Sequence, residues 1–222
     1  MAQQLSVKEI IAQETKKCAE DPIHFLKKYC LIQHPTRGKV HFHLYPFQED
    51  VLTQFHQHRY NIILKARQMG ISTLCAAYSL WRMIFKSDYN ILVIATTQDT
   101  AKSLVTKVRV MYENLPSWLK GMAQSTEDNK LSLRFANGSQ IKAVSSNESS
   151  ARSAGVSCLI FDEAAWAENA GKIWIAAQQT LATGGDAIIL SSPSGVGSWF
   201  HQTWVDAITN GTMNTIKLHW SQ

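Results

Sequence analysis

From residue 60 onward, short apolar runs alternate with segments of helical periodicity. The runs YNIILKA, NILVIAT, SCLIFDE and DAIILSS are continuously apolar, which is typical of strands buried on both faces. Such strands, separated by helices, predict an α/β fold with a mainly parallel central sheet flanked by helices. The expected strands are 60–66, 90–96, 157–163, 186–192 and 212–220, and the expected helices are 72–86, 98–114, 169–182 and 197–209.

Two other segments depart from this alternation. In LSLRFANGSQIKAVS, two alternating runs flank Asn137-Gly138, which predicts a β-hairpin insertion on the sheet. The first forty-odd residues are expected to be helical, with a capping box at Ser6 and Glu9, a second helix that begins at Asp21-Pro22 and a loop around residues 34–38 after it. We therefore expect a helical N-terminal segment at 1–43 and a main domain at 44–222.

Composition narrows the class of protein. With 222 residues, 45% hydrophobic and 18% charged, the chain has the composition of a folded globular protein. No apolar run is long enough to cross a bilayer, so no membrane partner is expected. The four cysteines are scattered, which fits free thiols in a reducing compartment. A net charge of +5 permits binding to nucleic acid without establishing it.

The stretch NIILKARQMGIST contains the parts of a phosphate-binding loop. An apolar strand leads to a turn at Gly70, and Ser72-Thr73 then open a helix. The usual pattern has lysine directly after this glycine, but here the position is Ile71. Backbone amides followed by a helix N-terminus still form an anion site, and Lys65 can supply the cation from the opposite side of the loop. Taken alone, the stretch is also compatible with an ordinary strand-to-helix turn.

Two adjacent carboxylates, Asp162 and Glu163, end the strand SCLIFDE. Because the loops of parallel strands open at the same edge of a sheet, we expect Asp162 beside the phosphate-binding loop. Asp162 and the hydroxyl of Ser72 are then candidate ligands of Mg²⁺, and Glu163 is a candidate base for the attacking water. A helix-capping Asp-Glu pair is the alternative, but both motifs together favour a nucleotide hydrolase. In YPFQ, the amide of Gln48 matches the edge of adenine, although a surface glutamine is the alternative.

The order of these motifs resembles the large terminase subunit of tailed bacteriophages, in its N-terminal DNA-packaging ATPase domain. YPFQEDVL resembles the adenine-contacting Q motif, KARQMGIST the variant Walker A loop, LIFDEAAW the Walker B segment, and SSPSG the coupling motif that senses the γ-phosphate. SSARSAGVSCLIFDE places Arg152 where the family has an arginine finger. The resemblance implies a P-loop NTPase of the additional-strand class.

The resemblance also implies roles for individual residues. Catalysis is expected from Glu163, Arg152, Lys65 and Arg67, and metal binding from Asp162 and Ser72. Nucleotide binding is expected from Gln48, Lys65, Ala66, Arg67, Gln68, Met69, Gly70, Ile71, Ser72, Thr73 and Ser192.

The implied activity is Mg²⁺-dependent ATP hydrolysis that drives double-stranded DNA into a procapsid in the host cytoplasm. The implied partners are the DNA, the portal protein, the small terminase subunit and further copies of the chain in a ring. The family's C-terminal nuclease domain is expected to be absent from this chain, so nuclease activity is not expected. A helicase-like or repair translocase and a nucleotide-binding assembly module that does not hydrolyse are the alternatives.

Overall fold

A single central sheet organises the structure, a computed structural model that describes residues 6–144 and 155–221. Its strands are β3 (Tyr60–Lys65), β4 (Asn90–Ala95), β5 (Ser125–Asn129), β6 (Ser132–Phe135), β7 (Gln140–Val144), β8 (Cys158–Asp162), β9 (Asp186–Ser191) and β10 (Asn214–Leu218). Among the described residues their order is β10-β3-β9-β8-β4-β7-β6-β5. The strands from β10 to β7 are parallel, while β6 and β5 are antiparallel additions at one edge.

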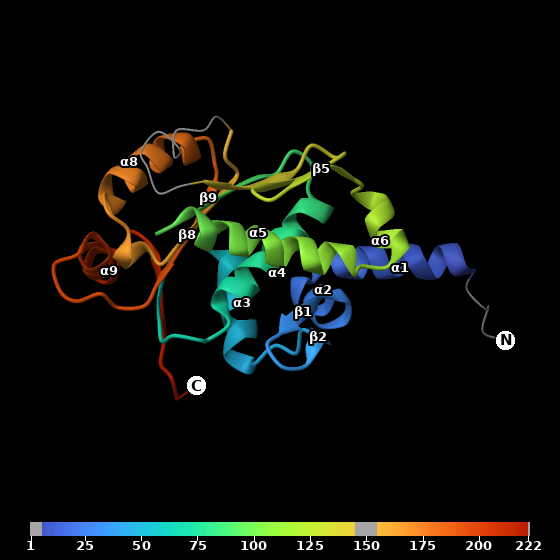
Figure 1. Cartoon of the computed structure of the whole chain (residues 1–222), viewed down its shortest axis with the longest axis horizontal. Coiled ribbons are helices and arrows are strands. Elements are labelled where there is room, and N and C mark those ends of the chain that lie inside the picture. Colours follow the sequence, from blue (N-terminus) through green and yellow to red (C-terminus); the bar gives the residue numbers. More distant parts are fainter. Residues whose placement is uncertain (1–5, 145–154, 222) are drawn as a thin grey trace.

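Helices cover both faces of this sheet (Figure 1). One face carries α1 (Val7–Glu20), α2 (Pro22–Tyr29), α3 (Pro46–Gln57), α4 (Ile71–Phe85), α5 (Gln98–Glu113) and α6 (Ser117–Met122). The other face carries α8 (Ala170–Leu181) and α9 (Trp199–Asn210), and the short 3-10 turn η1 (Ala164–Trp166) follows β8. Among the described helices, none is both long and apolar enough to cross a membrane.

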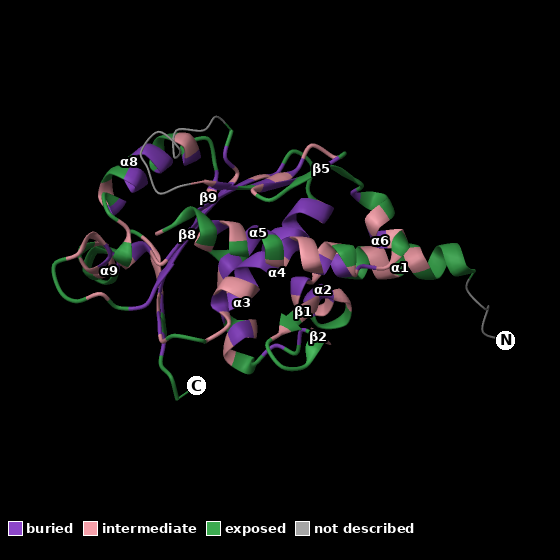
Figure 2. Ribbon diagram, in the orientation of Figure 1, coloured by how far each residue is buried: buried purple, intermediate pink, exposed green. Residues whose placement is uncertain are grey.

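Successive residues of each central strand contribute to two different hydrophobic cores. In β3, Ile63 packs with α3 and α4, whereas Ile62 packs on the α8 and α9 side. The same alternation holds in β4 for Val93 and Leu92. Since both faces are covered, the central strands are buried along their length (Figure 2), which explains why their sequences are continuously apolar.

The expected strands and helices from residue 60 onward are confirmed, with small differences at their ends. The N-terminal capping box is also confirmed, because Glu9 N donates to Ser6 Oγ and Ser6 N donates to Glu9 Oε2. Asp21 caps α2 through its bond from the backbone of His24.

Residues 31–41 contain the expected loop around 34–38, but the expectation that the residues on either side of it are helical is wrong. They form a β-hairpin of β1 (Leu31–His34) and β2 (Gly38–His41), paired from Leu31–His41 to His34–Gly38. The connection contains Pro35 and then Gly38, which has a φ of 72°. Both residues favour a turn over a continued helix.

The hairpin around Asn137-Gly138 is present, but it is part of the central sheet and not an insertion on it. Its strand β7 pairs antiparallel with β6 and parallel with β4. The neighbouring strand β5 was not expected, because every residue of its sequence STEDN is polar and exposed. Such a strand carries no hydrophobic pattern by which a sequence reveals it.

The turn at Gly138 gives a test of this edge of the sheet. Gly138 has a φ of 84°, and a Cβ atom there would lie 1.9 Å from Asp88 Oδ1. We predict that Gly138→Ala lowers the free energy of unfolding by about 2–3 kcal/mol in urea denaturation, through backbone strain and displacement of Asp88. Gly211→Ala is the control, because Gly211 has a φ of 66° but no atom within 4 Å of the added Cβ; it should cost about 1 kcal/mol. Equal losses would exclude the contact with Asp88 as a contribution.

Candidate active site

Three neighbouring parallel strands end at one edge of the sheet and bring the polar residues of three motifs together. β9 lies between β3 and β8, with Leu64 opposite Ser191 and Asp162 opposite Leu190. Lys65, Ser192 and Glu163 therefore emerge side by side at this edge. Residues almost 100 positions apart in the chain meet because parallel strands all end in the same direction.

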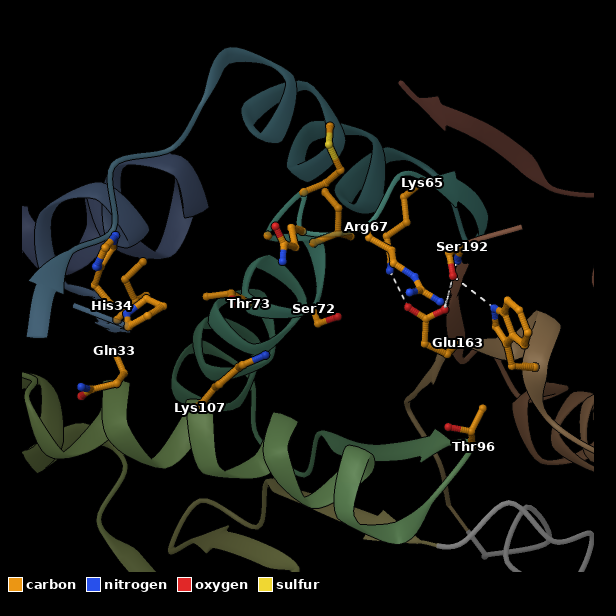
Figure 3. Close-up of a pocket in the computed structure, with 17 residues that line it drawn as sticks. Gln33, His34, Lys65, Arg67, Ser72, Thr73, Thr96, Lys107, Glu163 and Ser192 are labelled. Carbon is orange, nitrogen blue, oxygen red and sulfur yellow. Dashed lines mark hydrogen bonds and ion pairs between the residues drawn. The ribbon is translucent and has the colours of Figure 1, made fainter. Parts of the chain in front are cut away.

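The loop between β3 and α4 forms the wall of a cavity of about 770 Å³ (Figure 3). Gln68 and Gly70 both have left-handed backbone conformations, with φ of 63° and 71°. This geometry turns the chain from the strand into the helix, whose first residues are Ile71, Ser72 and Thr73. The unpaired amides at the start of α4 thus face the cavity, which is a favourable position for a phosphate.

Lys65 and Glu163 form an ion pair at the strand ends. Lys65 Nζ lies 2.8 Å from Glu163 Oε1, and the lysine side chain is only 7% exposed. The second carboxylate oxygen of Glu163 accepts hydrogen bonds from the backbone N (3.1 Å) and Oγ (3.0 Å) of Ser192. Trp166 Nε1 donates to the same Ser192 Oγ at 3.1 Å. The carboxylate is therefore held by residues at the ends of β9 and β3, the next two strands of the sheet on one side of β8.

The two adjacent carboxyl groups have opposite electrostatic environments. Burial raises the pKa of Asp162 despite the hydrogen bond from Ser72 and the attraction of Lys65. For Glu163, burial also opposes ionisation, but the hydrogen bonds from Lys65 and Ser192 outweigh it and lower the pKa. Glu163 is therefore ionised at neutral pH and ready to orient a water molecule or accept a proton.

Asp162 and Ser72 provide oxygen atoms that suit a hard divalent cation. Ser72 Oγ donates to Asp162 Oδ2 at 2.7 Å, and Asp162 Oδ1 accepts the backbone N–H of Glu163 at 2.9 Å. The expected proximity of Asp162 to the loop is thus confirmed. A hydroxyl and a carboxylate oxygen at the first turn of a phosphate-loop helix fit Mg²⁺, which takes few protein ligands and retains several waters.

Gln48 lies behind the phosphate loop and supports it. Its Nε2 donates to Met69 O at 3.0 Å, and its Oε1 accepts from Tyr45 N at 3.1 Å. The residue is 3% exposed and lines an adjoining cavity of about 600 Å³ together with Tyr45 and Phe47, whose rings stack at 5.7 Å. Both polar atoms of the amide are therefore already bonded within the protein.

Most of the residues expected in the site line the main cavity. They are Lys65, Arg67, Gln68, Met69, Gly70, Ile71, Ser72, Thr73, Glu163 and Ser192. The Ala66 amide instead donates to Leu218 O at 3.1 Å, which fixes the loop to β10. The side chain of Ile71 is buried in the core at 1% exposure, so only its backbone can meet a ligand. Arg152 lies outside the described residues.

The structure adds groups that the motifs did not indicate. Lys107 of α5, Trp166 of η1 and residues 32–35 of the β1–β2 hairpin all line the cavity. For Lys107 the sequence does contain a signal, because this lysine interrupts the apolar stripe of α5 between Leu104 and Met111. Of the hairpin, only the loop around 34–38 was expected, and no motif placed residues 32–35 in the cavity.

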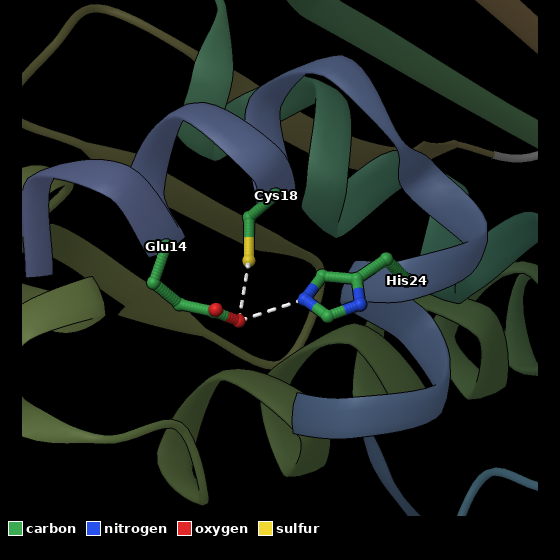
Figure 4. A group of neighbouring side chains, drawn as sticks. All are labelled: Glu14, Cys18 and His24. Carbon is green, nitrogen blue, oxygen red and sulfur yellow. Dashed lines mark hydrogen bonds and ion pairs between the residues drawn. The ribbon is translucent and has the colours of Figure 1, made fainter. Parts of the chain in front are cut away.

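The described residues contain one group of three potential metal ligands, Glu14, Cys18 and His24 (Figure 4), which are not among the residues that line the phosphate-loop cavity. Glu14 Oε1 is bonded to His24 Nε2 (2.7 Å), Lys28 Nζ (2.8 Å) and Tyr29 Oη (2.9 Å). The ammonium of Lys28 already supplies a positive charge to the Glu14 carboxylate. Burial raises the pKa of the Cys18 thiol to about 12. We interpret this group as a joint between α1 and α2 and not as a metal centre.

The chain matches one protein family over residues 62–220, described as the terminase large subunit, T4likevirus-type, N-terminal. It is also similar to solved structures. A variant of the large terminase ATPase domain of Thermus phage P74-26 has a TM-score of 0.64 at 19% identity, covering 79% of this chain and 81% of that one. The large terminase of bacteriophage HK97 has a TM-score of 0.72 at 18% identity, covering 91% of this chain and 43% of that one.

A third similar structure is a large terminase from a thermophilic bacteriophage in complex with ADP, with a TM-score of 0.62 at 14% identity. It covers 78% of this chain and 45% of that one, so the present chain spans less than half of these longer terminases.

The fold and the strand-end residues define a P-loop NTPase of the additional-strand class, because β9 is inserted between the phosphate-loop strand β3 and the acidic strand β8. Within this class, the family match covers most of the chain. The chain belongs to the phage terminase large subunit family, as its N-terminal ATPase domain.

We predict that the ion pair sets the ionisation of Glu163. In Lys65→Met, burial is no longer offset by the ammonium, so the pKa of Glu163 should rise. Carbon-13 NMR of the labelled carboxyl group measures this directly. Lys142→Met, which removes an exposed lysine of β7, is the control and should leave the value unchanged. An unchanged pKa in Lys65→Met would show that Ser192 alone holds the carboxylate.

We predict a pH-dependent contribution from Glu14. Hydrogen bonds from Lys28 and then His24 lower the pKa of Glu14 from 4.5 to about 2. Because the folded value is depressed, its stabilisation is present above pH 4.5 and is lost as the pH falls toward 2. Glu14→Gln should therefore reduce the free energy of unfolding by about 1–2 kcal/mol at pH 7 and by almost nothing near pH 2.

Urea denaturation at several pH values tests this, with Glu20→Gln as the control on the same helix. Within the part of the chain that the structure describes, Glu20 makes an exposed, 3.9 Å ion pair with Lys16 and no hydrogen bond through its side chain. A loss in Glu14→Gln that stays constant down to pH 2 would contradict the assignment.

Proposed function

We propose that this domain hydrolyses ATP with Mg²⁺ and that hydrolysis powers the translocation of double-stranded viral DNA into a procapsid. The observation that carries the proposal is the carboxylate of Glu163, held between Lys65 and Ser192 at the mouth of the phosphate-loop cavity. Membership of the terminase large subunit family supports the same conclusion. Structures of similar large terminases contain ADP or ATP-γ-S, which supports an adenine nucleotide as the ligand.

In this proposal the phosphates bind at the start of α4. The loop amides and the side chains of Lys65 and Arg67 meet their charge, while Ser72 and Asp162 hold Mg²⁺. The metal, when bound, neutralises charge that develops on the phosphoryl oxygens. The adenine occupies the adjoining cavity near Tyr45 and Gln48, where the glutamine supports the loop from behind.

Glu163 orients the attacking water and accepts its proton. Lys65 is paired with Glu163 in the structure, and in this proposal the lysine turns from the carboxylate toward phosphate when ATP binds. Ser192, at the end of β9, donates hydrogen bonds to the same carboxylate. In this proposal a movement of the carboxylate therefore moves the end of that strand. An early release of Lys65 would thus couple arrival of the nucleotide to activation of the base.

The wider assembly follows from the family. We propose double-stranded DNA, the portal protein and the small terminase subunit as partners, with several copies of the chain in a ring in the host cytoplasm. Arg152 is proposed as the finger that reaches the transferring phosphoryl group. The net charge of +5 is compatible with contact to DNA.

A nucleotide-binding assembly module without hydrolysis is the alternative of a different class. An ATPase assay with and without DNA separates the two, because a module of that kind binds nucleotide but releases no phosphate. A helicase-like translocase would hydrolyse ATP as well but would act on DNA without a portal.

We predict different losses for the two carboxylates. Removing a positioned base typically costs on the order of 10²–10⁴ in rate, so Glu163→Gln should bind Mg-ATP with near-normal affinity but release phosphate very slowly. Asp162→Ala should instead lose the Mg²⁺-dependent part of binding. Calorimetric titration with and without Mg²⁺, combined with a phosphate-release assay, measures both effects.

Glu168→Gln, a change beyond η1 at a residue that does not line the cavity, is the control for the loss of a nearby carboxylate. Near-normal turnover by Glu163→Gln would remove Glu163 from the chemical step.

A further inference from the structure

Lys107 lies on the wall of the phosphate-loop cavity, on a helix outside the sequence motifs. It follows Leu104 by three residues and precedes Met111 by four, and both of these residues are buried. This spacing places Lys107 on the inward face of α5. In Figure 3 its side chain extends from α5 toward Ser72 and Thr73, in the first turn of α4.

The Lys107 amine makes no hydrogen bond or ion pair with any residue in 6–144 or 155–221. Burial lowers the pKa of Lys107, and the attraction of Asp162 offsets this only in part. Among the described residues, no fully buried side-chain nitrogen or oxygen lacks a hydrogen-bond partner, so the amine opens on the cavity. A half-buried ammonium without an anion is unfavourable, which makes this position suited to an anionic ligand.

The other cationic side chains that line the cavity, Lys65 and Arg67, have different surroundings from Lys107. Lys65 is bound to Glu163, and Arg67 is exposed. Figure 3 shows Lys107 on the opposite side of the α4 N-terminus from both of them. An anion at this helix terminus therefore lies between positive charges from two directions, one on the phosphate loop and one on α5.

We propose that Lys107 binds the terminal phosphates of the nucleoside triphosphate and supplies the charge that a lysine at position 71 would normally bring. Ile71 cannot do so, because its side chain is apolar and points into the core. The proposal rests on the proposed function, and it assigns to α5 a role in distinguishing triphosphate from diphosphate.

A purely structural role for Lys107 has different consequences. If the lysine serves only to neutralise Asp162, its removal destabilises the protein without nucleotide and does not affect the preference for the triphosphate. If Lys107 instead has no anionic partner until phosphate binds, its removal eliminates an unpaired charge. The nucleotide-free protein should then be as stable as the wild type or more stable.

The test uses the whole 222-residue chain with Mg²⁺ and compares the affinities for ATP-γ-S and ADP by calorimetry. Lys107→Met should weaken ATP-γ-S at least tenfold and ADP much less, and Lys107→Arg should restore part of the loss. Lys102→Met, on the same helix but away from the cavity, should leave both affinities unchanged. The melting temperature of nucleotide-free Lys107→Met should equal or exceed that of the wild type.

Three results would overturn the proposal. An unchanged affinity of Lys107→Met for ATP-γ-S excludes contact with the phosphates, while the proposed ATPase stands if the wild type still hydrolyses ATP. Equal weakening of ATP-γ-S and ADP excludes the terminal phosphate as the contact. A wild type that neither binds ATP-γ-S nor hydrolyses ATP overturns the role of Lys107 and the proposed function together.

Discussion

The insertion of β9 between β3 and β8 is the constraint on which the site depends. It separates the phosphate loop from the acidic strand by one strand width, and it places Ser192 between Lys65 and Glu163. The Glu163 carboxylate is then shared by two neighbouring strand ends. Because all three strands are buried on both faces, a register shift of one residue would exchange the side chains that pack in the two cores, so close packing holds these polar groups in place.

The missing loop lysine is explained by packing and by charge. Ile71 is part of the hydrophobic core under α4, so the position contributes stability and a backbone amide but no cation. Positive charge reaches the cavity from Lys65 on the strand side and from Lys107 on the α5 side. The Lys65–Glu163 pair also favours the ionised form of a half-buried carboxylate, because the hydrogen bond from Lys65 lowers the pKa of Glu163 against the effect of burial.

Local patterns allowed much of the fold and part of the site to be predicted. Continuous apolar runs identified the parallel strands, and the polar residues near the ends of YNIILKA, SCLIFDE and DAIILSS identified the strand ends that meet at one edge. The hydrophobic pattern did not predict strands in the segments where it is weak or absent. The polar strand β5 has no apolar alternation, and for the β1–β2 hairpin the loop at Pro35 and Gly38 was predicted but the short strands on either side of it were not.

The sequence by itself determined which residues end each buried strand, because hydrophobic periodicity and glycine conformation act over a few residues. It thereby placed Lys65, Asp162, Glu163 and Ser192 at a common edge. Only the tertiary structure decided which of these side chains pair with each other and which further residues share their cavity. Strand order set the contact of Lys65 with Glu163, and the packing of α5 over α4 brought Lys107 to the cavity. Such contacts join residues far apart in the chain, and they depend on how whole elements pack, which no short pattern contains.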